Sequence, residues 1–348
     1  MEKNTILCVQ DVMSTIPTTF NQYFPSYTVI GGRENFHSTG LSVVLLNRGG
    51  RYARRGLFHD FEKIGFDTVV SVEPEPAHYD LEELSARFPF VRFVIPHTRI
   101  SLGEQINMAV SELDSPLFFV LWNDLKMIAG GNAQRMAERL ARHAENGNGN
   151  GKRKGQFMRL CTVPVIQNSH LDIIPTVIAP VIRQNKIQTR FLNPSGEGLL
   201  SLYPFDGIGI YDRERFIQLG GFDGTLKNSF WQLMDFGFRA YLWGEEIALS
   251  QTLRFSYEAS VPAEDNSTDN DYPRFYLKNI APMFRNDCAY LPVRRFPGFL
   301  FKAKHDIFSA WEEFSESRRW VHTNSFRWRC NPKTIASHWN LETPKKEG

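Results

Sequence analysis

The sequence has few cysteines, almost no net charge and no long hydrophobic run, and each shortage excludes a class of protein. Its 4 cysteines, at 8, 161, 288 and 330, are scattered among 348 residues without a Cys-x-x-Cys pair. This scatter indicates a reducing compartment and argues against a zinc site. The formal net charge of +2 gives no reason to expect general affinity for nucleic acid, so no nucleic-acid partner is predicted.

Targeting and membrane-spanning segments are missing as well. No stretch reaches the roughly 20 apolar residues that a transmembrane helix needs. The first residues, Met-Glu-Lys-Asn-Thr-Ile-Leu-Cys, lack the basic flank and the long apolar core of a signal peptide. We therefore expect a cytoplasmic protein, with peripheral contact at the inner face of a membrane left open.

What the sequence does contain is an alternation of apolar runs and amphipathic segments. Apolar runs typical of buried strands occupy 41–46, 67–72, 91–96 and 117–122. Segments with helical spacing lie between them, at 56–64, 81–88 and 101–113. Ser101 and Glu104 form a capping box at the start of the third. Strands and helices in this order predict an α/β fold with a Rossmann-like, mostly parallel sheet flanked by helices.

Polar side chains follow three of the four predicted strands: Asn47-Arg48, Glu73 with Glu75, and Asn123-Asp124. Parallel strands bring their carboxyl ends to one edge of the sheet, where ligands bind in open α/β folds. A carboxylate such as Asp124 can hold a hard cation, and the cation can hold a phosphate. The alternative is that these loops are polar only because they face water, and that Asn123-Asp124 caps a turn.

The stretch 203–249 is the second informative part of the chain. A helix over 213–219 is predicted to end at Gly220-Gly221. A second helix, over 230–243, places Asp235 and Arg239 one turn apart on one face. Strands are expected at 157–165, 207–211 and 247–255, a flexible loop at 146–155, and a further loop at 184–202.

The segment 285–348 is basic and aromatic. It carries 12 Lys and Arg against 7 Asp and Glu. Its aromatic residues include Phe296, Phe299, Phe301, Phe308, Trp311, Phe314, Trp320, Phe326, Trp328 and Trp339. Such a composition can lie in a membrane interface. It can equally form a helical extension that packs on the domain through its aromatic side chains, and base-stacking on nucleic acid is a third alternative.

Taken in order, these features resemble the inverting family-2 glycosyltransferases of the GT-A fold, over about residues 41–257. The matching elements are Ser42–Arg48, Val69–Glu73, Leu102-Gly103 with Asn107, Leu121–Asp124, Gly220–Asp223, and Asp235–Arg239 followed by Gly244. The resemblance implies an N-terminal extension (1–40), a GT-A domain (41–258) and a C-terminal helical extension (259–348). Within the domain, 41–127 would be the nucleotide-binding half and 157–258 the acceptor half.

The resemblance also implies an activity and its residues. A hexosyltransferase-like enzyme of polysaccharide biosynthesis would transfer a sugar, with inversion, from a nucleotide-diphosphate sugar to a glycan or lipid-linked acceptor. Mg²⁺ or Mn²⁺ on Asp124 would neutralise the diphosphate, and Asp235 would be the general base. Asp206, Asp223 and Arg239 would lie on the acceptor side. The donor would contact Asn47, Arg48, Glu73, Glu75, Gly103, Asn107, Asn123 and Asp124.

Three departures from the family pattern keep a second function open. Trp122 replaces the first acid of the metal-binding element, Gln232-Leu233 replaces the acidic pair before Asp235, and Tyr257 replaces the histidine after the last strand. These changes favour a module that binds a nucleotide sugar, glycan or partner without turnover. A nicotinamide dehydrogenase needs a GxGxxG turn after its first strand, which Asn47-Arg-Gly-Gly-Arg-Tyr-Ala does not supply.

Overall fold

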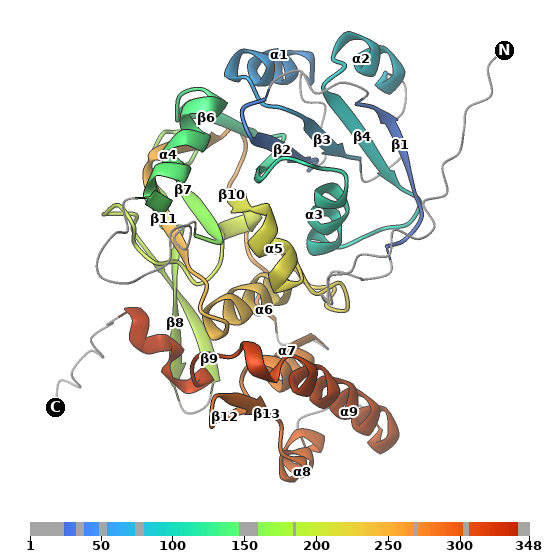
Figure 1. The fold of residues 1–348 in the computed structure, drawn as a ribbon, viewed down its shortest axis with the longest axis vertical. Coiled ribbons are helices and arrows are strands. Elements are labelled where there is room, and N and C mark those ends of the chain that lie inside the picture. The colour runs from blue at the N-terminus through green and yellow to red at the C-terminus, as the bar shows by residue number, and fades with distance from the viewer. Residues whose placement is uncertain are drawn as a thin grey trace.

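The computed structural model describes residues 24–32, 38–48, 54–73, 80–145, 159–183, 186–267, 271–301 and 306–339. Within these ranges, nine strands form one sheet in the order β1-β4-β3-β2-β5-β10-β7-β11-β6 (Figure 1). Most of the strands run in the same direction, and helices flank the sheet. The predicted α/β fold class is therefore confirmed.

The four apolar runs predicted as strands form the parallel half of the sheet. They are β2 (Leu41–Leu46), β3 (Val69–Val72), β4 (Val91–Pro96) and β5 (Leu117–Trp122). β2 pairs in parallel with both neighbours, so that Leu46 lies opposite Val72 and Trp122. Every residue of β2, β3 and β5 is buried, which explains why these runs show no polar alternation in the sequence.

Three strands run against this direction. β1 (Tyr27–Gly31) pairs with β4, β10 (Gly209–Asp212) with β5 and β7 (Cys161–Gln167), and β6 (Leu125–Ala129) with β11 (Ile247–Tyr257). β7 and β11 are parallel. The stretch predicted as an N-terminal extension thus contributes β1 to the sheet. The sequence does not predict β6, because this edge strand has mostly accessible side chains and no apolar run.

Helices cover both faces of the sheet. They are α1 (Arg54–Ile64), α2 (Leu81–Arg87), α3 (Leu102–Ser111), α4 (Ala133–Glu145), α5 (Arg213–Leu219) and α6 (Ser229–Leu242). α1 and α2 lie on the face opposite α3 (Figure 1). This follows from right-handed crossovers, because the chain moves outward from β2 to β4 and then returns to β5. The predicted capping box of α3 is present.

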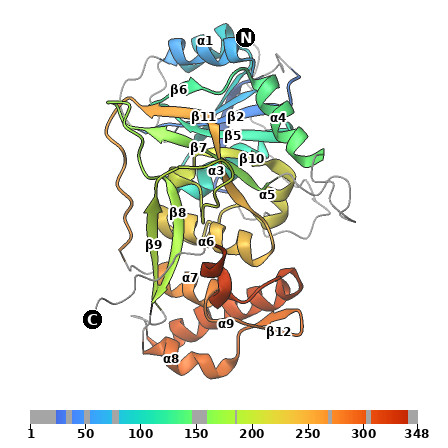
Figure 2. The ribbon, with the colours of Figure 1, turned by 90° about the vertical axis from the view of Figure 1, so that its left-hand side faces the viewer.

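The C-terminal part packs below the sheet domain (Figures 1 and 2). It contains α7 (Asp271–Asn279), β12 (Met283–Arg285), β13 (Cys288–Tyr290), α8 (Phe296–Leu300) and α9 (Ile307–Thr323). Short 3-10 turns are η1 (Phe205–Gly207), η2 (Val293–Arg295), η3 (Ser325–Arg327) and η4 (Pro332–Trp339). A hairpin of β8 (Val177–Arg183) and β9 (Lys186–Leu192) stands beside α6. The prediction of a loop over 184–202 is therefore wrong for the residues of β9. This strand is polar and belongs to a two-stranded ribbon, so its sequence lacks the apolar pattern of a buried strand.

The aromatic side chains of the C-terminal extension divide into two groups. Phe299, Phe314 and Trp328 are buried. Two further rings contact the domain, Trp320 on Trp243 and Trp339 on Tyr241, so the predicted packing of this segment through its aromatic residues is confirmed for these two. Phe301 and Phe308 are 91% and 84% exposed. No helix in the described ranges is long and apolar enough to cross a membrane.

Helix α6 is the centre of the lower half of the molecule. Every residue from Phe230 to Leu242 is buried, and the helix lies between the sheet and the C-terminal helices (Figure 2). Its backbone approaches Leu202 so closely that a side chain on Gly237 would overlap the Leu202 carbonyl oxygen. Gly237 is therefore required by packing.

Gly237→Ala is expected to lower the free energy of unfolding by about 1–3 kcal/mol, because the helix must move to admit the methyl group. Urea unfolding measures the change. Gly56→Ala in α1 is the matched control, since nothing lies within 4 Å of its Cβ position. The control is expected to be neutral or to stabilise the protein by up to about 1 kcal/mol. Equal stability of the two variants would contradict the prediction.

Candidate functional site

Polar and aromatic side chains from four separate segments meet at the carboxyl edge of β5. Arg48 follows β2 and Asp124 follows β5, as predicted. Asp206 precedes β10, which runs antiparallel to β5, so that its start lies at the end of β5. Tyr257 is the last residue of β11. The fold therefore brings together predicted donor-side and acceptor-side residues.

The guanidinium of Arg48 is the centre of this group. It donates one hydrogen bond to Oδ2 of Asp124, at 3.4 Å, and another to Oδ2 of Asp206. The Arg48 backbone N–H donates to Oδ1 of Asn123, at 3.1 Å. The side chain of Arg48 keeps 27% of its surface exposed, whereas that of Asp124 keeps only 2%. Arg48 is thus the side of this ion pair that a ligand can reach.

Two aromatic rings hold Arg48 in place. The guanidinium carbon lies 3.8 Å from the centroid of the Trp122 ring and 5.9 Å from that of Tyr257. Both rings also bind Asp206, since Trp122 Nε1 donates to its carbonyl oxygen and the Tyr257 hydroxyl to its carboxylate, each at 2.9 Å. Two of the three departures noted in the sequence, Trp122 and Tyr257, therefore contact the same arginine.

Asp206 has an unusual backbone and a shifted pKa. Its φ of 55° lies in the left-handed region, which aspartate tolerates better than most residues. Burial raises the pKa of Asp206 to about 6, although Arg48 and Tyr257 stabilise the ionised form. Its side chain is 14% exposed. A carboxylate with a pKa near neutrality and some access to solvent suits proton transfer.

Glu264 is a residue of this region that the sequence analysis missed. The Tyr203 hydroxyl donates to its Oε2 at 2.8 Å, and its Oε1 is buried without a hydrogen-bond partner among the described residues. Burial raises the pKa of Glu264 to about 7, and the negative charge of Asp206 contributes to the shift. No local pattern marks Glu264, because it stands in the polar stretch after β11 that reads as a linker.

Glu73 and Asn47 form a separate buried network beside this group. Glu73 accepts hydrogen bonds from Ser71 and Asn47, at 2.8 and 3.2 Å, and from Arg54 at 2.9 Å. Asn47 also donates to the backbone of Val72. Glu73 and Asn47, which were predicted to contact the sugar-nucleotide donor, thus lie at the expected edge of the sheet, and their side chains hydrogen-bond to other protein groups. Glu75 lies outside the described residues.

The residues around Asp124 do not fit a resident divalent cation. Oδ2 of Asp124 faces the positively charged Arg48, and Oδ1, which has no hydrogen-bond partner among the described residues, is inaccessible to solvent. An ion could reach neither oxygen without rearrangement. The predicted role of Asp124 as a metal ligand is therefore not supported by this geometry.

Gly103 and Asn107 join α3 to the loop before α6. The Gly103 N–H donates to Oε1 of Gln232 at 2.9 Å, and Asn107 exchanges two hydrogen bonds with the backbone of Phe222. A Cβ on Gly103 would meet the Phe222 side chain. These contacts give both residues a packing role in place of the predicted contact with the donor. Gln232, at a position where the resemblance expects an acid, is thus one of the residues that connect α3 with α6.

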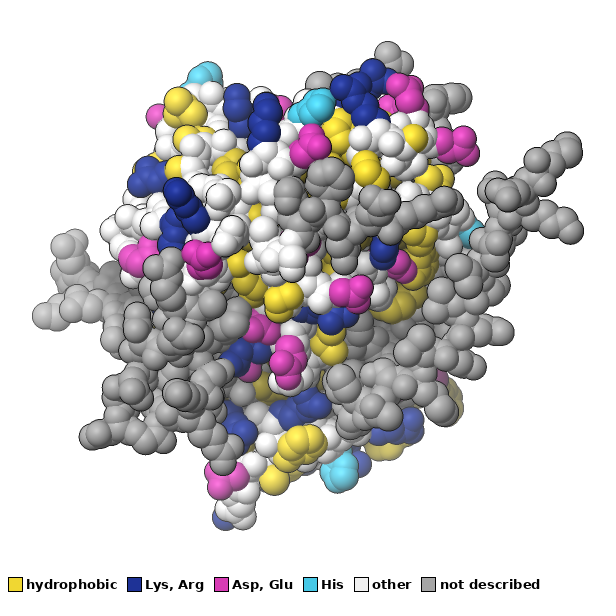
Figure 3. Space-filling view, turned by 45° about the horizontal axis from the view of Figure 1, so that its top comes forward, with side chains coloured by type: hydrophobic (Ala, Val, Ile, Leu, Met, Phe, Trp, Pro, Cys, Tyr) yellow, Lys and Arg dark blue, Asp and Glu magenta, His cyan; other side chains and the backbone are white. Residues whose placement is uncertain are grey.

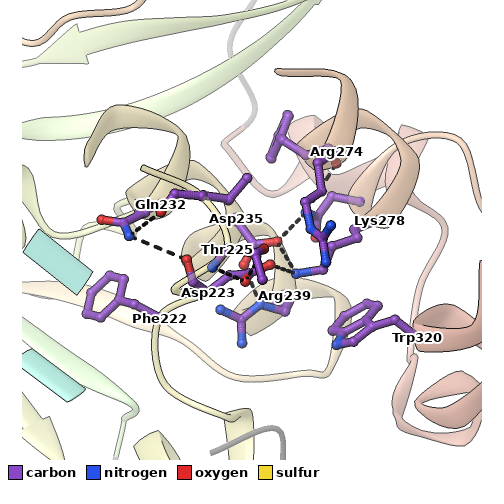
Figure 4. Close-up of polar contacts among 12 residues, drawn as sticks. Phe222, Asp223, Thr225, Gln232, Asp235, Arg239, Arg274, Lys278 and Trp320 are labelled. Carbon is purple, nitrogen blue, oxygen red and sulfur yellow. Dashed lines mark hydrogen bonds and ion pairs between the residues drawn. The ribbon is translucent and has the colours of Figure 1, made fainter. Parts of the chain in front are cut away.

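Asp223, Asp235 and Arg239 form a buried ion network with Lys278 from α7 (Figure 4). Asp235 is 0% exposed, and it accepts from Arg239 at 2.7 Å and from Asn279 at 2.7 Å. Lys278 contacts both aspartates. Although burial opposes it, the charge of Lys278 lowers the pKa of Asp223.

This network argues against the predicted chemical roles of its members. A general base needs an oxygen that the acceptor can reach, and Asp235 has none. Arg239 also donates to the carbonyl oxygens of Leu219 and Gly221, which leaves it no access to an acceptor. The network instead attaches α6 to the C-terminal part of the chain. Trp320 from α9 packs against Lys278, with 4.3 Å between Nζ and the centroid of the Trp320 ring.

A cavity of about 390 Å³ lies at the opposite end of the sheet. It lies between α4 and the sheet, near the first residue of β5 and the last residue of β10, and its lining includes Arg139, Arg159, Glu197, Asp212 and Glu246. None of the predicted site residues lines it.

On the face shown in Figure 3, acidic and basic side chains of the described residues are interspersed.

Comparison with solved structures identifies the fold. The crystal structure of GalNAc-T7 with UDP, GalNAc and Mn²⁺ superposes with a TM-score of 0.51 at 15% identity, and the match covers 86% of this chain and 58% of that one. The chain has the GT-A fold. The GT-A fold expected from the resemblance is therefore confirmed.

Other solved structures are similar at lower scores. TarS of S. aureus matches with a TM-score of 0.45 at 14% identity, over 80% of this chain and 42% of TarS. The mannosyltransferase PcManGT of Pyrobaculum calidifontis, crystallised with GDP-Man and Mn²⁺, matches with a TM-score of 0.39 at 10% identity, over 81% and 69% of the two chains. The chain spans about half the length of the first two structures. By sequence, it matches no family model and no curated protein.

Proposed function

We propose that the protein transfers a sugar, with inversion, from a nucleotide-diphosphate sugar to a glycan or lipid-linked acceptor. One observation carries the proposal. At the carboxyl edge of β5, where open α/β folds bind their ligands, a GT-A fold assembles an accessible arginine and a partly accessible aspartate from distant segments. The first can bind a diphosphate and the second can accept a proton.

On the donor side, Arg48 faces the diphosphate, whose negative charge grows as the glycosidic bond breaks. A preorganised guanidinium stabilises that charge. Asn123 fixes the Arg48 backbone, and the Trp122 ring fixes its side chain. Asp124 orients the guanidinium through their ion pair. The predicted divalent cation on Asp124 has no part in this mechanism, because the residues present do not fit it.

On the acceptor side, Asp206 takes the role predicted for Asp235. An acceptor hydroxyl must lose a proton as it attacks the anomeric carbon. Of the three predicted acceptor-side or catalytic carboxylates, Asp206 is the most exposed, at 14%, against 10% for Asp223 and 0% for Asp235. Its pKa of about 6 leaves it ionised near neutral pH and able to accept a proton.

A second function, binding without turnover, is favoured by a specific observation. Gln232-Leu233 on α6 stands where the resemblance expects an acidic pair whose second member is the base, and the neighbouring Asp235 is buried in an ion network. If Asp206 serves only to hold Arg48 and Tyr257, the chain binds a nucleotide sugar, glycan or partner protein without reacting with it. Membrane contact through 285–348 stays a prediction, supported by the exposed Phe301 and Phe308.

The test combines binding with turnover. UDP-, GDP- and dTDP-sugars are screened for a rise in melting temperature, because a ligand at 100 times its Kd adds about 2.7 kcal/mol to stability. Release of the nucleoside diphosphate from the best ligand is then measured, with water and with mixed glycans as acceptors. Asp206→Asn is expected to retain donor binding, because it removes a negative charge beside Arg48, and to slow release by about 100-fold or more.

The outcomes separate the two functions. Binding followed by release that depends on Asp206 supports the transferase. Binding without release in the wild type indicates the module without turnover. A melting temperature that no sugar nucleotide changes would overturn the transferase and would leave the module only as a binder of a glycan or a partner protein.

A further inference from the structure

The two aromatic residues that replace the family's metal ligands contact the same guanidinium. Trp122 stands at the first acidic position of the metal-binding element, and Tyr257 at that of the histidine. In the structure, Trp122 lies against Arg48 with 3.8 Å between the guanidinium carbon and the ring centroid. The centroid of the Tyr257 ring lies 5.9 Å from the same carbon. Trp122 and Tyr257 thus replace two expected metal ligands with aromatic rings, and both rings contact Arg48.

The carboxylate that keeps the family position is engaged by that arginine. Asp124 pairs with Arg48, and its other oxygen is buried. A divalent ion at Asp124 would lie beside a fixed positive charge and would be repelled by it. The cation in this part of the site is therefore a side chain of the protein.

Arg48 retains the capacity to bind a phosphate. A guanidinium has five N–H donors in a planar fork, and the contacts with Asp124 and Asp206 use two of them. More than a quarter of the side-chain surface is exposed. Guanidinium and phosphate form paired, charge-assisted hydrogen bonds. The exposed part of the fork is available for such a pair.

We propose that Arg48 supplies the positive charge that faces the donor's diphosphate, and that the donor binds without a divalent cation. This inference rests on the proposed function, since it concerns the same donor site. The arginine and its two aspartates together carry one more negative than positive charge. Arg48 therefore has to share its donors between the carboxylates and the diphosphate, and we expect moderate affinity.

Calorimetry with UDP, GDP and dTDP tests the inference, in EDTA and again in MnCl₂. For the nucleotide that binds best, the wild-type Kd is expected to differ by less than about threefold between the two conditions. Arg48→Gln is expected to weaken binding at least about tenfold in both, because a charge-assisted pair is lost. Arg48→Lys, which keeps the charge and loses the planar fork, is expected to fall between them.

Arg319→Gln is the matched control, because Arg319 is an exposed arginine on α9, away from this site. It should bind like the wild type. Circular dichroism confirms that each variant is folded, and the wild-type comparison of EDTA with Mn²⁺ is decisive even if Arg48→Gln does not fold.

A wild-type Kd that worsens more than about tenfold in EDTA would overturn the inference and leave the proposed function standing. So would unchanged binding by folded Arg48→Gln. If neither a nucleoside diphosphate nor a nucleotide sugar binds in either condition, the proposed function is wrong and the inference falls with it.

Discussion

Replacing Asp235 with alanine is expected to lower the free energy of unfolding by about 3–5 kcal/mol, because removing one member of a buried ion network leaves the others uncompensated. Lys278 and Arg239 are each 3% exposed and both contact Asp235. Without that carboxylate, two positive charges remain in the interior with only Asp223 to balance them. Urea unfolding followed by circular dichroism measures the loss.

The matched control for this change is Glu83→Ala, which removes one member of an ion pair with Arg55 at the surface. Both side chains of that pair are more than half exposed, and the expected loss is below about 1 kcal/mol. A destabilisation of Asp235→Ala no larger than that of the control would contradict the structural role. It would return Asp235 to the list of candidate bases.

Replacing Glu264 with glutamine is expected to stabilise the protein by about 2–3 kcal/mol at about pH 8, because ionisation of the buried carboxyl is unfavourable in the folded state. Burial raises the pKa of Glu264 from its usual value of 4.5 to about 7. The folded state therefore holds the proton more tightly than the unfolded state. Stability from this group is complete below about pH 4.5 and is lost as the pH rises through about 7.

Glutamine cannot ionise, and so the variant avoids this loss. Its advantage over the wild type should shrink to about zero near pH 4.5. The groups that face Glu264 are the Tyr203 hydroxyl and the Asp206 carboxylate, and both are retained in the variant. Glu258→Gln, at an exposed position on the same segment, is the control. Thermal unfolding at both pH values measures the effect, and a difference that does not depend on pH would contradict the prediction.

The order of elements could be read from the chain because local rules determine it. The runs at 41–46, 91–96 and 117–122 are strands with the expected bounds, since strands buried on both faces must be continuously apolar. The capping box at Ser101 and the left-handed Gly220 mark helix ends through contacts within a few residues. β6 and β9 were not predicted, because each is stabilised by pairing with another strand. β6 pairs with β11 and β9 with β8, and the residues of β6 and β9 do not themselves indicate these partners.

The roles of the polar residues were decided by tertiary structure. A sequence pattern places Asp235, Asn107 and Gly103 in family positions, but whether a side chain meets a ligand or another part of the chain depends on what packs against it. Here α7 supplies Lys278 and Asn279, which close over Asp235.

The sequence by itself determined the fold, through the periodicity of its apolar residues and the polar ends of its strands. Only the folded chain decided which charges remain within reach of a ligand. Trp122, Asp206 and Tyr257 are far apart in sequence, and they meet around Arg48 because β2, β5 and β11 end, and β10 begins, at one edge of the sheet. Such long-range contacts set the burial and the electrostatic environment of each group, and these properties determine its chemistry.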